Sequence, residues 1–216
     1  MGDVNVQLVR EFFELNRFQV LTYYPRETTG RGHTDHIFQL FVENTRPASG
    51  ENAGFVLEED DLPGIARAAV EVRAWHADRF YASVIESSRV LSEFIEEKSL
   101  AVAENVFGDQ PFATILVLSE LPASPEPRER SIQLLRDTGT THVIEFPTIL
   151  QGLLEKISAA GTYPASDTLQ TLRLLKRYGL IRDQQMEFAF PIEAPPTSPG
   201  TPVETADASE QADDDE

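Results

Sequence analysis

Hydrophobic positions recur along the chain with two periods, one of about 3.6 residues and one of 2. The first period predicts amphipathic helices, and the second predicts strands with one buried face. An almost continuous apolar run, residues 112–119, is instead typical of a strand buried on both faces. In chain order, the predicted elements are a helix (3–16), three strands (18–24, 35–43 and 67–75), a long helix (77–97), a short helix (100–107), a strand (112–119), a helix (126–137), a strand (141–145) and two helices (147–157 and 167–178).

This order predicts an α/β fold with a mixed central sheet. An early antiparallel meander is followed by a helix that crosses to a buried strand, so we expect an α-β-β-β-α-β core. Helices should cover both faces of the sheet, with extra helices at the C-terminal end. The domain is predicted to span residues 1–185, with a polar loop over 44–64 that contains a short strand at 55–57.

The last part of the sequence has a different composition. Residues 191–216 hold eight acidic side chains, five prolines and no basic residue. Such a segment buries too little apolar surface to offset the entropy lost on ordering, so residues 186–216 are predicted to form a disordered, Pro-rich acidic tail. The tail either aids solubility or docks on a basic protein partner.

The charge and the cysteine content restrict which binding partners and which cellular compartment we expect. The net charge is −18, and residues 1–190 retain 28 acidic side chains against 18 basic ones, a net −10. No broad basic face is therefore expected, although a local basic pocket for nucleic acid stays open. The absence of cysteine favours a reducing, cytoplasmic location. The sequence predicts neither a membrane span nor a signal peptide.

Charged residues gather at one end of the predicted sheet. Glu71 and Arg73 are two positions apart, so they should share one face of the third strand. If that strand and the second are antiparallel neighbours, Asp35 lies close to both. The two carboxylates could then hold Mg²⁺ or Mn²⁺ through oxygen ligands, and the metal would activate a water molecule against a phosphate. Positive charge for binding the phosphate would come from nearby residues, namely Arg26, Arg31, His33 and His76.

The segments 33–37 (HTDHI) and 70–73 (VEVR) resemble the two motif segments of the restriction-endonuclease-like, or PD-(D/E)xK, nucleases. The resemblance covers about residues 3–120 and includes the order of elements. It implies metal-dependent cleavage of nucleic acid phosphodiesters, with Asp35 and Glu71 as metal ligands and Arg73 as the phosphate-facing cation. It also implies Glu11 as an additional acid. Arg73 stands where the family has lysine, and an arginine keeps the charge but does not serve as a general base.

Several other interpretations stay open. The domain could be a non-catalytic interaction module that kept the fold, which the substituted cation, the acidic body and the acidic tail favour. The charged residues of the third strand could form an ion pair at a solvated end of the sheet. An unrelated α/β domain also fits, because a fold alone does not specify a function.

Two further patterns could indicate a functional site, but each also fits an ordinary structural role. A nitrogen and oxygen zinc site could be built from His33, Asp35, His36 and His76, although surface histidines also fit. Residues 166–181 look like a helix from a winged-helix DNA-binding domain. A C-terminal core helix with Ser166 as its N-cap fits the same pattern, and no basic stripe accompanies it.

Overall fold

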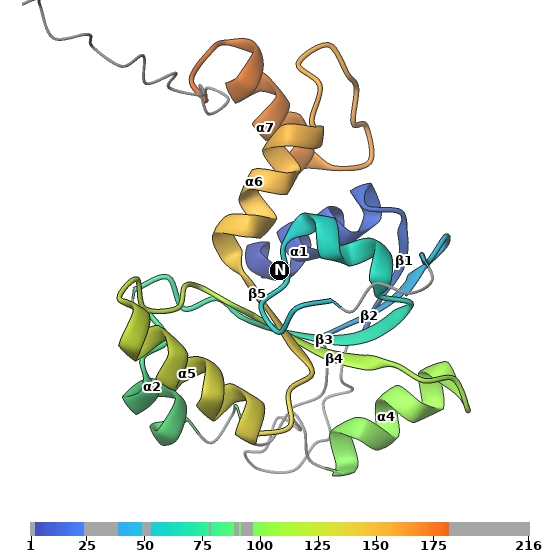
Figure 1. Ribbon diagram of the computed structural model, residues 1–216. Helices are drawn as coiled ribbons and strands as arrows, with labels where there is room; N and C mark the ends of the chain where they lie inside the picture. The colour runs from blue at the N-terminus through green and yellow to red at the C-terminus, as the bar shows by residue number, and fades with distance from the viewer. Residues whose placement is uncertain are drawn as a thin grey trace, which may run out of the picture. The chain divides into compact units, whose positions relative to one another are not determined.

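The computed structural model (Figure 1) describes residues 3–23, 39–48, 53–77, 79–88, 91 and 97–181. The predicted acidic tail, residues 186–216, lies outside these residues. No helix in these segments is long and apolar enough to cross a membrane.

A five-stranded mixed sheet forms the centre of the protein, with strand order β1-β2-β3-β4-β5 (Figure 1). The strands are β1 (Phe18–Thr22), β2 (Leu40–Asn44), β3 (Arg67–Arg73), β4 (Ala113–Leu118) and β5 (His142–Glu145). The pairs β1–β2 and β2–β3 are antiparallel, whereas β3–β4 and β4–β5 are parallel. The predicted α/β class and mixed sheet are confirmed. The run 112–119 forms a fully interior strand, since β4 is buried from Thr114 to Leu118.

One face of the sheet packs against α1 (Val4–Leu15), the 3₁₀ helix η1 (Glu59–Gly64), α6 (Phe146–Lys156) and α7 (Asp167–Arg177). The buried side of α1 contributes Val9, Phe12 and Phe13, as its apolar spacing predicts. Helix α6 approaches α1 closely at Gly152, where an added Cβ would lie 2.6 Å from the ring of Phe12. The side chains of this face form one hydrophobic core.

The other face packs against α2 (Ala82–Ser87), α4 (Glu97–Phe107) and α5 (Pro125–Asp137). Its core includes Phe41 and Ala69 of the sheet together with Ala103 of α4 and Leu135 of α5. Helices therefore cover both faces, as predicted, and Figure 1 shows α2, α4 and α5 on the side opposite to α1 and α6.

The predicted long helix over residues 77–97 is wrong. Helix α2 begins only at Ala82 and ends at Ser87, and Ser88 has an extended backbone. Before the helix, the backbone N–H of Phe80 donates a hydrogen bond to the carbonyl oxygen of Glu120 (2.8 Å), which ties this segment to the connection that follows β4. At its end, the hydroxyl of Ser87 donates to the carbonyl of Val84, a local bond that competes with helix continuation.

Local capping interactions mark other helix ends, including the predicted N-cap Ser166. The side chain of Asp3 accepts from the N–H of Asn5 (2.9 Å), and the hydroxyl of Ser166 accepts from the N–H of Leu169 (3.0 Å). Gly179 follows α7 with a φ of 69°, a conformation that favours glycine. Helix α7 buries Leu169 in the core, so it is the C-terminal core helix that the sequence favoured. The predicted strand at 55–57 is reduced to a single parallel bridge between Val56 and Val143.

Candidate functional site

The central strand of the sheet carries a carboxylate and a cation on one face, Glu71 and Arg73. Side chains alternate along a strand, so both project from the face of β3 that carries Ala69 and packs against α2, α4 and α5. Pairing with β4 places Glu71 opposite Leu116 and Arg73 opposite Leu118. The predicted antiparallel pairing of β2 with β3 is confirmed. The pair therefore lies toward the carboxyl end of β3.

Glu71 is buried, and its charge state is perturbed. Its side chain is 1% exposed, whereas that of Arg73 is 19% exposed, and Nη2 of Arg73 forms an ion pair with Oε1 of Glu71. Burial raises the pKa of Glu71 from 4.5 to about 7, and the positive charge of Arg73 opposes that rise. The alternative of an ion pair between these two residues is therefore confirmed, but its expected solvation is wrong for Glu71, because the carboxylate is enclosed by the core.

The second oxygen of the Glu71 carboxylate, Oε2, accepts no hydrogen bond from the described part of the chain. A buried oxygen without a partner raises the free energy of the folded state, so a cationic ligand would be stabilising there. Oxygen is the ligand type that Mg²⁺ prefers. Within residues 3–181, apart from the gaps, no three histidine, aspartate or glutamate side chains are placed to hold a metal ion. Glu71 thus fits as one ligand of a set that these residues do not complete.

Gln39, directly before β2, flanks Glu71, although no motif in the sequence marks it. Its backbone N–H donates to the carbonyl oxygen of Val70 (3.1 Å), and its side-chain oxygen accepts from the N–H of Val72 (2.9 Å). Gln39 therefore binds β3 on both sides of Glu71. The antiparallel register was the available signal, because Leu40 lies opposite Val70 and the preceding residue must lie beside Glu71.

Five of the predicted site residues lie outside the described residues. They are Arg26, Arg31, His33, Asp35 and His36. The predicted approach of Asp35 to Glu71, the phosphate-binding role of this segment and the zinc alternative all stay predictions.

His76 lies just beyond β3, on the surface. Its Nε2 is 3.0 Å from Oδ1 of Asn5, and its ring meets the ring of Phe146 edge-on with centroids 4.7 Å apart. It lines a cavity of about 290 Å³ with residues that follow β4 and β5, including Ser119 and Pro147. His76 is thus held between the start of α1 and the start of α6, and not by contacts with the Glu71 carboxylate.

The structure does not bring Glu11 and Glu71 together. Glu11 is buried on α1, where its Oε1 accepts hydrogen bonds from Nε2 of Gln7 (2.7 Å) and from the hydroxyl of Ser166. Helix α1 packs on one face of the sheet, and Glu71 projects from the other. These contacts give Glu11 a structural role, which is to join α1 to the N-terminus of α7.

Comparison with known proteins identifies no family for this chain. No family model matches it, and no curated protein or solved structure shows significant similarity to it.

Proposed function

We propose that this chain is a divalent-metal-dependent, nuclease-like domain that acts on nucleic acid phosphodiesters. The observation that carries the proposal is the state of Glu71, a carboxylate that is 1% exposed, has a pKa of about 7 and has one oxygen without a partner in the described chain. Strongly perturbed carboxylates are concentrated at functional sites. The chain order also supports a restriction-endonuclease-like core, because α1 and the meander β1–β3 precede α2, α4 and β4.

In this proposal, Glu71 and Asp35 hold Mg²⁺ or Mn²⁺, and Arg73 faces the phosphate. Asp35 precedes Gln39 by four residues, a length that an extended chain spans in about 14 Å, and Gln39 binds β3 beside Glu71. When bound, the metal polarises the phosphodiester and lowers the pKa of an attacking water molecule. Arg73 balances the charge of Glu71 in the free protein and stabilises negative charge on a phosphate placed beside it.

The ion pair itself favours a second candidate function, a non-catalytic interaction module that retains the nuclease fold. Arg73 already neutralises Glu71, and a guanidinium does not lose its proton to act as a general base. The net charge of −18 also suits a protein partner better than a polyanion.

A cleavage assay on single- and double-stranded DNA and RNA, with Mg²⁺ or Mn²⁺, separates these functions. We expect cleavage by the wild type that Glu71→Gln abolishes, with Glu43→Gln as a matched control on the neighbouring strand β2. Cleavage only by Arg73→Lys would also support a nuclease fold, in which Arg73 makes the wild type inactive. No cleavage by the wild type, Glu71→Gln or Arg73→Lys would reject the nuclease proposal in favour of the interaction module.

A further inference from the structure

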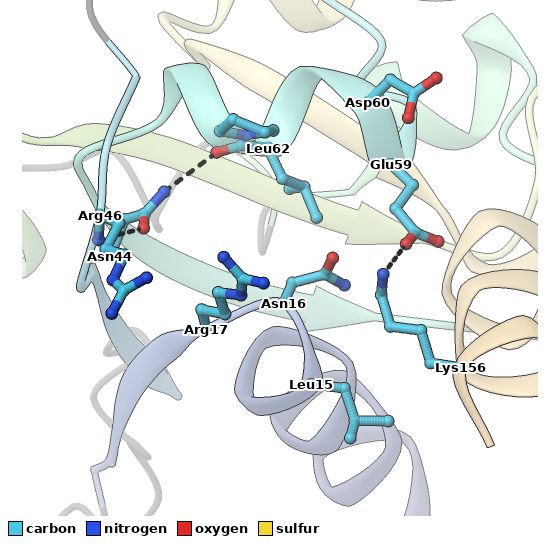
Figure 2. A pocket seen from close by; sticks show the side chains of 10 residues that line it. Leu15, Asn16, Arg17, Asn44, Arg46, Glu59, Asp60, Leu62 and Lys156 are labelled. Atoms are coloured by element: carbon cyan, nitrogen blue, oxygen red, sulfur yellow. Dashed lines mark hydrogen bonds and ion pairs between the residues drawn. The ribbon is translucent and has the colours of Figure 1, made fainter. Parts of the chain in front are cut away.

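A polar pocket lies at the end of the sheet opposite to the Glu71–Arg73 pair, where β1 begins and β2 ends (Figure 2). Its volume is about 310 Å³, within the range of small-molecule sites. Asn16 and Arg17, from the connection between α1 and β1, line one part of it, and Asn44 and Arg46 line another. Apolar contacts come from Leu15, Leu62 and Pro63, and charged ones from Glu59, Asp60 and Lys156.

Arg17 and Arg46 lack the carboxylate partner that six other arginines of the described chain have. Neither forms an ion pair with any residue of the described chain, whereas six others do, namely Arg10, Arg67, Arg73, Arg79, Arg128 and Arg130. Both guanidinium groups lie on the same side of the pocket in Figure 2. Two guanidinium charges without an ion-pair partner in the described residues therefore line one cavity, in a chain whose net charge is −18.

The backbone fixes these arginines in place. Arg17 is in the left-handed region, with a φ of 67°, directly after the end of α1, where glycine is favoured. Its carbonyl oxygen accepts hydrogen bonds from the N–H (3.1 Å) and the hydroxyl (2.8 Å) of Thr45. The N–H of Arg46 donates to Oδ1 of Asn44 (2.9 Å). The two arginines are thus linked through adjacent, hydrogen-bonded backbone.

The acidic residues of the pocket do not neutralise the arginines. Glu59 forms an ion pair with Lys156 at the far side of the pocket, and Asp60 points away from both guanidinium groups (Figure 2). The side-chain amide of Asn44 is buried against η1, where its Nδ2 lies 3.5 Å from the carbonyl oxygen of Leu62. The side that carries Arg17 and Arg46 is therefore the anion-accepting side.

We propose that this pocket binds a phosphate monoester through Arg17 and Arg46. Guanidinium groups present forked N–H donors that match the oxygens of a phosphate, and two of them match its double negative charge. The apolar wall beside them accommodates the organic part of the ligand. The monoester belongs either to a small metabolite or to the 5′ end of a nucleic acid, because both present the same chemistry to the pocket.

Isothermal titration tests this site without any divalent metal, so its outcome is independent of Glu71. The probes are inorganic phosphate, adenosine 5′-monophosphate, adenosine, and a tetranucleotide with and without a 5′-phosphate. We expect phosphate-dependent binding that weakens at least tenfold in Arg17→Gly and in Arg46→Gln. Arg177→Gln, at an exposed arginine on α7, and Glu71→Gln should bind as the wild type does.

The Arg17→Gly variant separates binding from folding, because glycine suits the backbone at that position and should not lower the melting temperature. Preferential binding of the phosphorylated tetranucleotide would identify a nucleic acid end as the source of the phosphate, and preferential binding of the mononucleotide would identify a metabolite. The proposal is overturned if no phosphate-bearing probe binds, if adenosine binds as tightly as its monophosphate, or if Arg17→Gly and Arg46→Gln bind as the wild type does.

Discussion

The charged side chains near the two ends of strand β3 differ in burial and in pairing. Toward its carboxyl end, Glu71 is enclosed by the core and pairs with Arg73. Near its amino end, Arg17 and Arg46 are exposed, line a pocket and form no ion pair with the described chain. Charge in the core destabilises the fold unless something offsets it, whereas charge at the surface has little effect on stability. Removing a charge should therefore change the free energy of unfolding far more at the buried end than at the exposed end.

The largest effect should come from removing the cation at the buried end. Arg73→Ala leaves Glu71 without its neutralising partner, and we expect a loss of about 3 kcal/mol in the free energy of unfolding at pH 8. Urea denaturation measures this change, with Arg17→Ala as the control at the open end. Equal effects of the two variants would break the contrast between the ends.

Removing the buried charge itself should stabilise the protein in a pH-dependent way. The pKa of Glu71 is about 7 in the folded protein against an ordinary 4.5, so the folded state keeps a proton that the unfolded chain releases between those values. The free energy of unfolding of the wild type should fall as pH rises through this range, by at most about 3 kcal/mol.

Glu71→Gln removes this titration, so the variant should exceed the wild type in stability at pH 8 and differ little from it at pH 4. Paired urea denaturation curves at the two pH values measure the difference. A variant that is less stable than the wild type at pH 8 would show that the Arg73 ion pair outweighs the effect of burial.

At the open end, relief of backbone strain should give a smaller gain. Arg17 holds a left-handed conformation that costs a residue with a side chain about 1 kcal/mol relative to glycine. Arg17→Gly should therefore raise the free energy of unfolding by up to about that amount, as measured by thermal melting. A lower melting temperature would show that the arginine side chain stabilises the fold.

The smallest effect should come from an exposed ion pair next to the pocket. Nε of Arg67 lies 3.0 Å from Oε1 of Glu43 across strands β2 and β3, and the two side chains are 23% and 50% exposed. Arg67→Gln should change the free energy of unfolding by less than about 1 kcal/mol, and 0.5 M NaCl should reduce the difference further. A loss of unfolding free energy as large as that of Arg73→Ala would show that solvent and salt do not screen this ion pair.

Periodicity predicted the parts of the fold that depend on local pattern. The alternation in residues 67–75 placed Glu71 and Arg73 on one face, and the apolar run before Ser119 marked an interior strand. Caps such as Ser166 marked helix ends, because their hydrogen bonds involve residues that are close in the sequence.

The features that the sequence did not reveal depend on distant contacts. The break before α2 arises from the bond of Phe80 to Glu120, forty residues away, and no periodicity encodes it. The burial of Glu71 results from the layer of α2, α4 and α5 on that face of the sheet, so the sequence left a solvated sheet end open as an alternative that the structure excludes for Glu71. Arg17 and Arg46 line one pocket because of the register of β1 with β2. The sequence predicted the two strands but not which residues of each lie opposite one another.

The most direct test of the central claim, that Glu71 is a metal ligand, is titration of Mn²⁺ into the wild type, Glu71→Gln and Glu43→Gln at pH 8. At this pH most Glu71 side chains are ionised, since the pKa is about 7. We predict saturable binding to the wild type and to Glu43→Gln, and its loss in Glu71→Gln, whose fold should be no less stable. Equal Mn²⁺ affinity in all three proteins would contradict the assignment of Glu71 as a metal ligand.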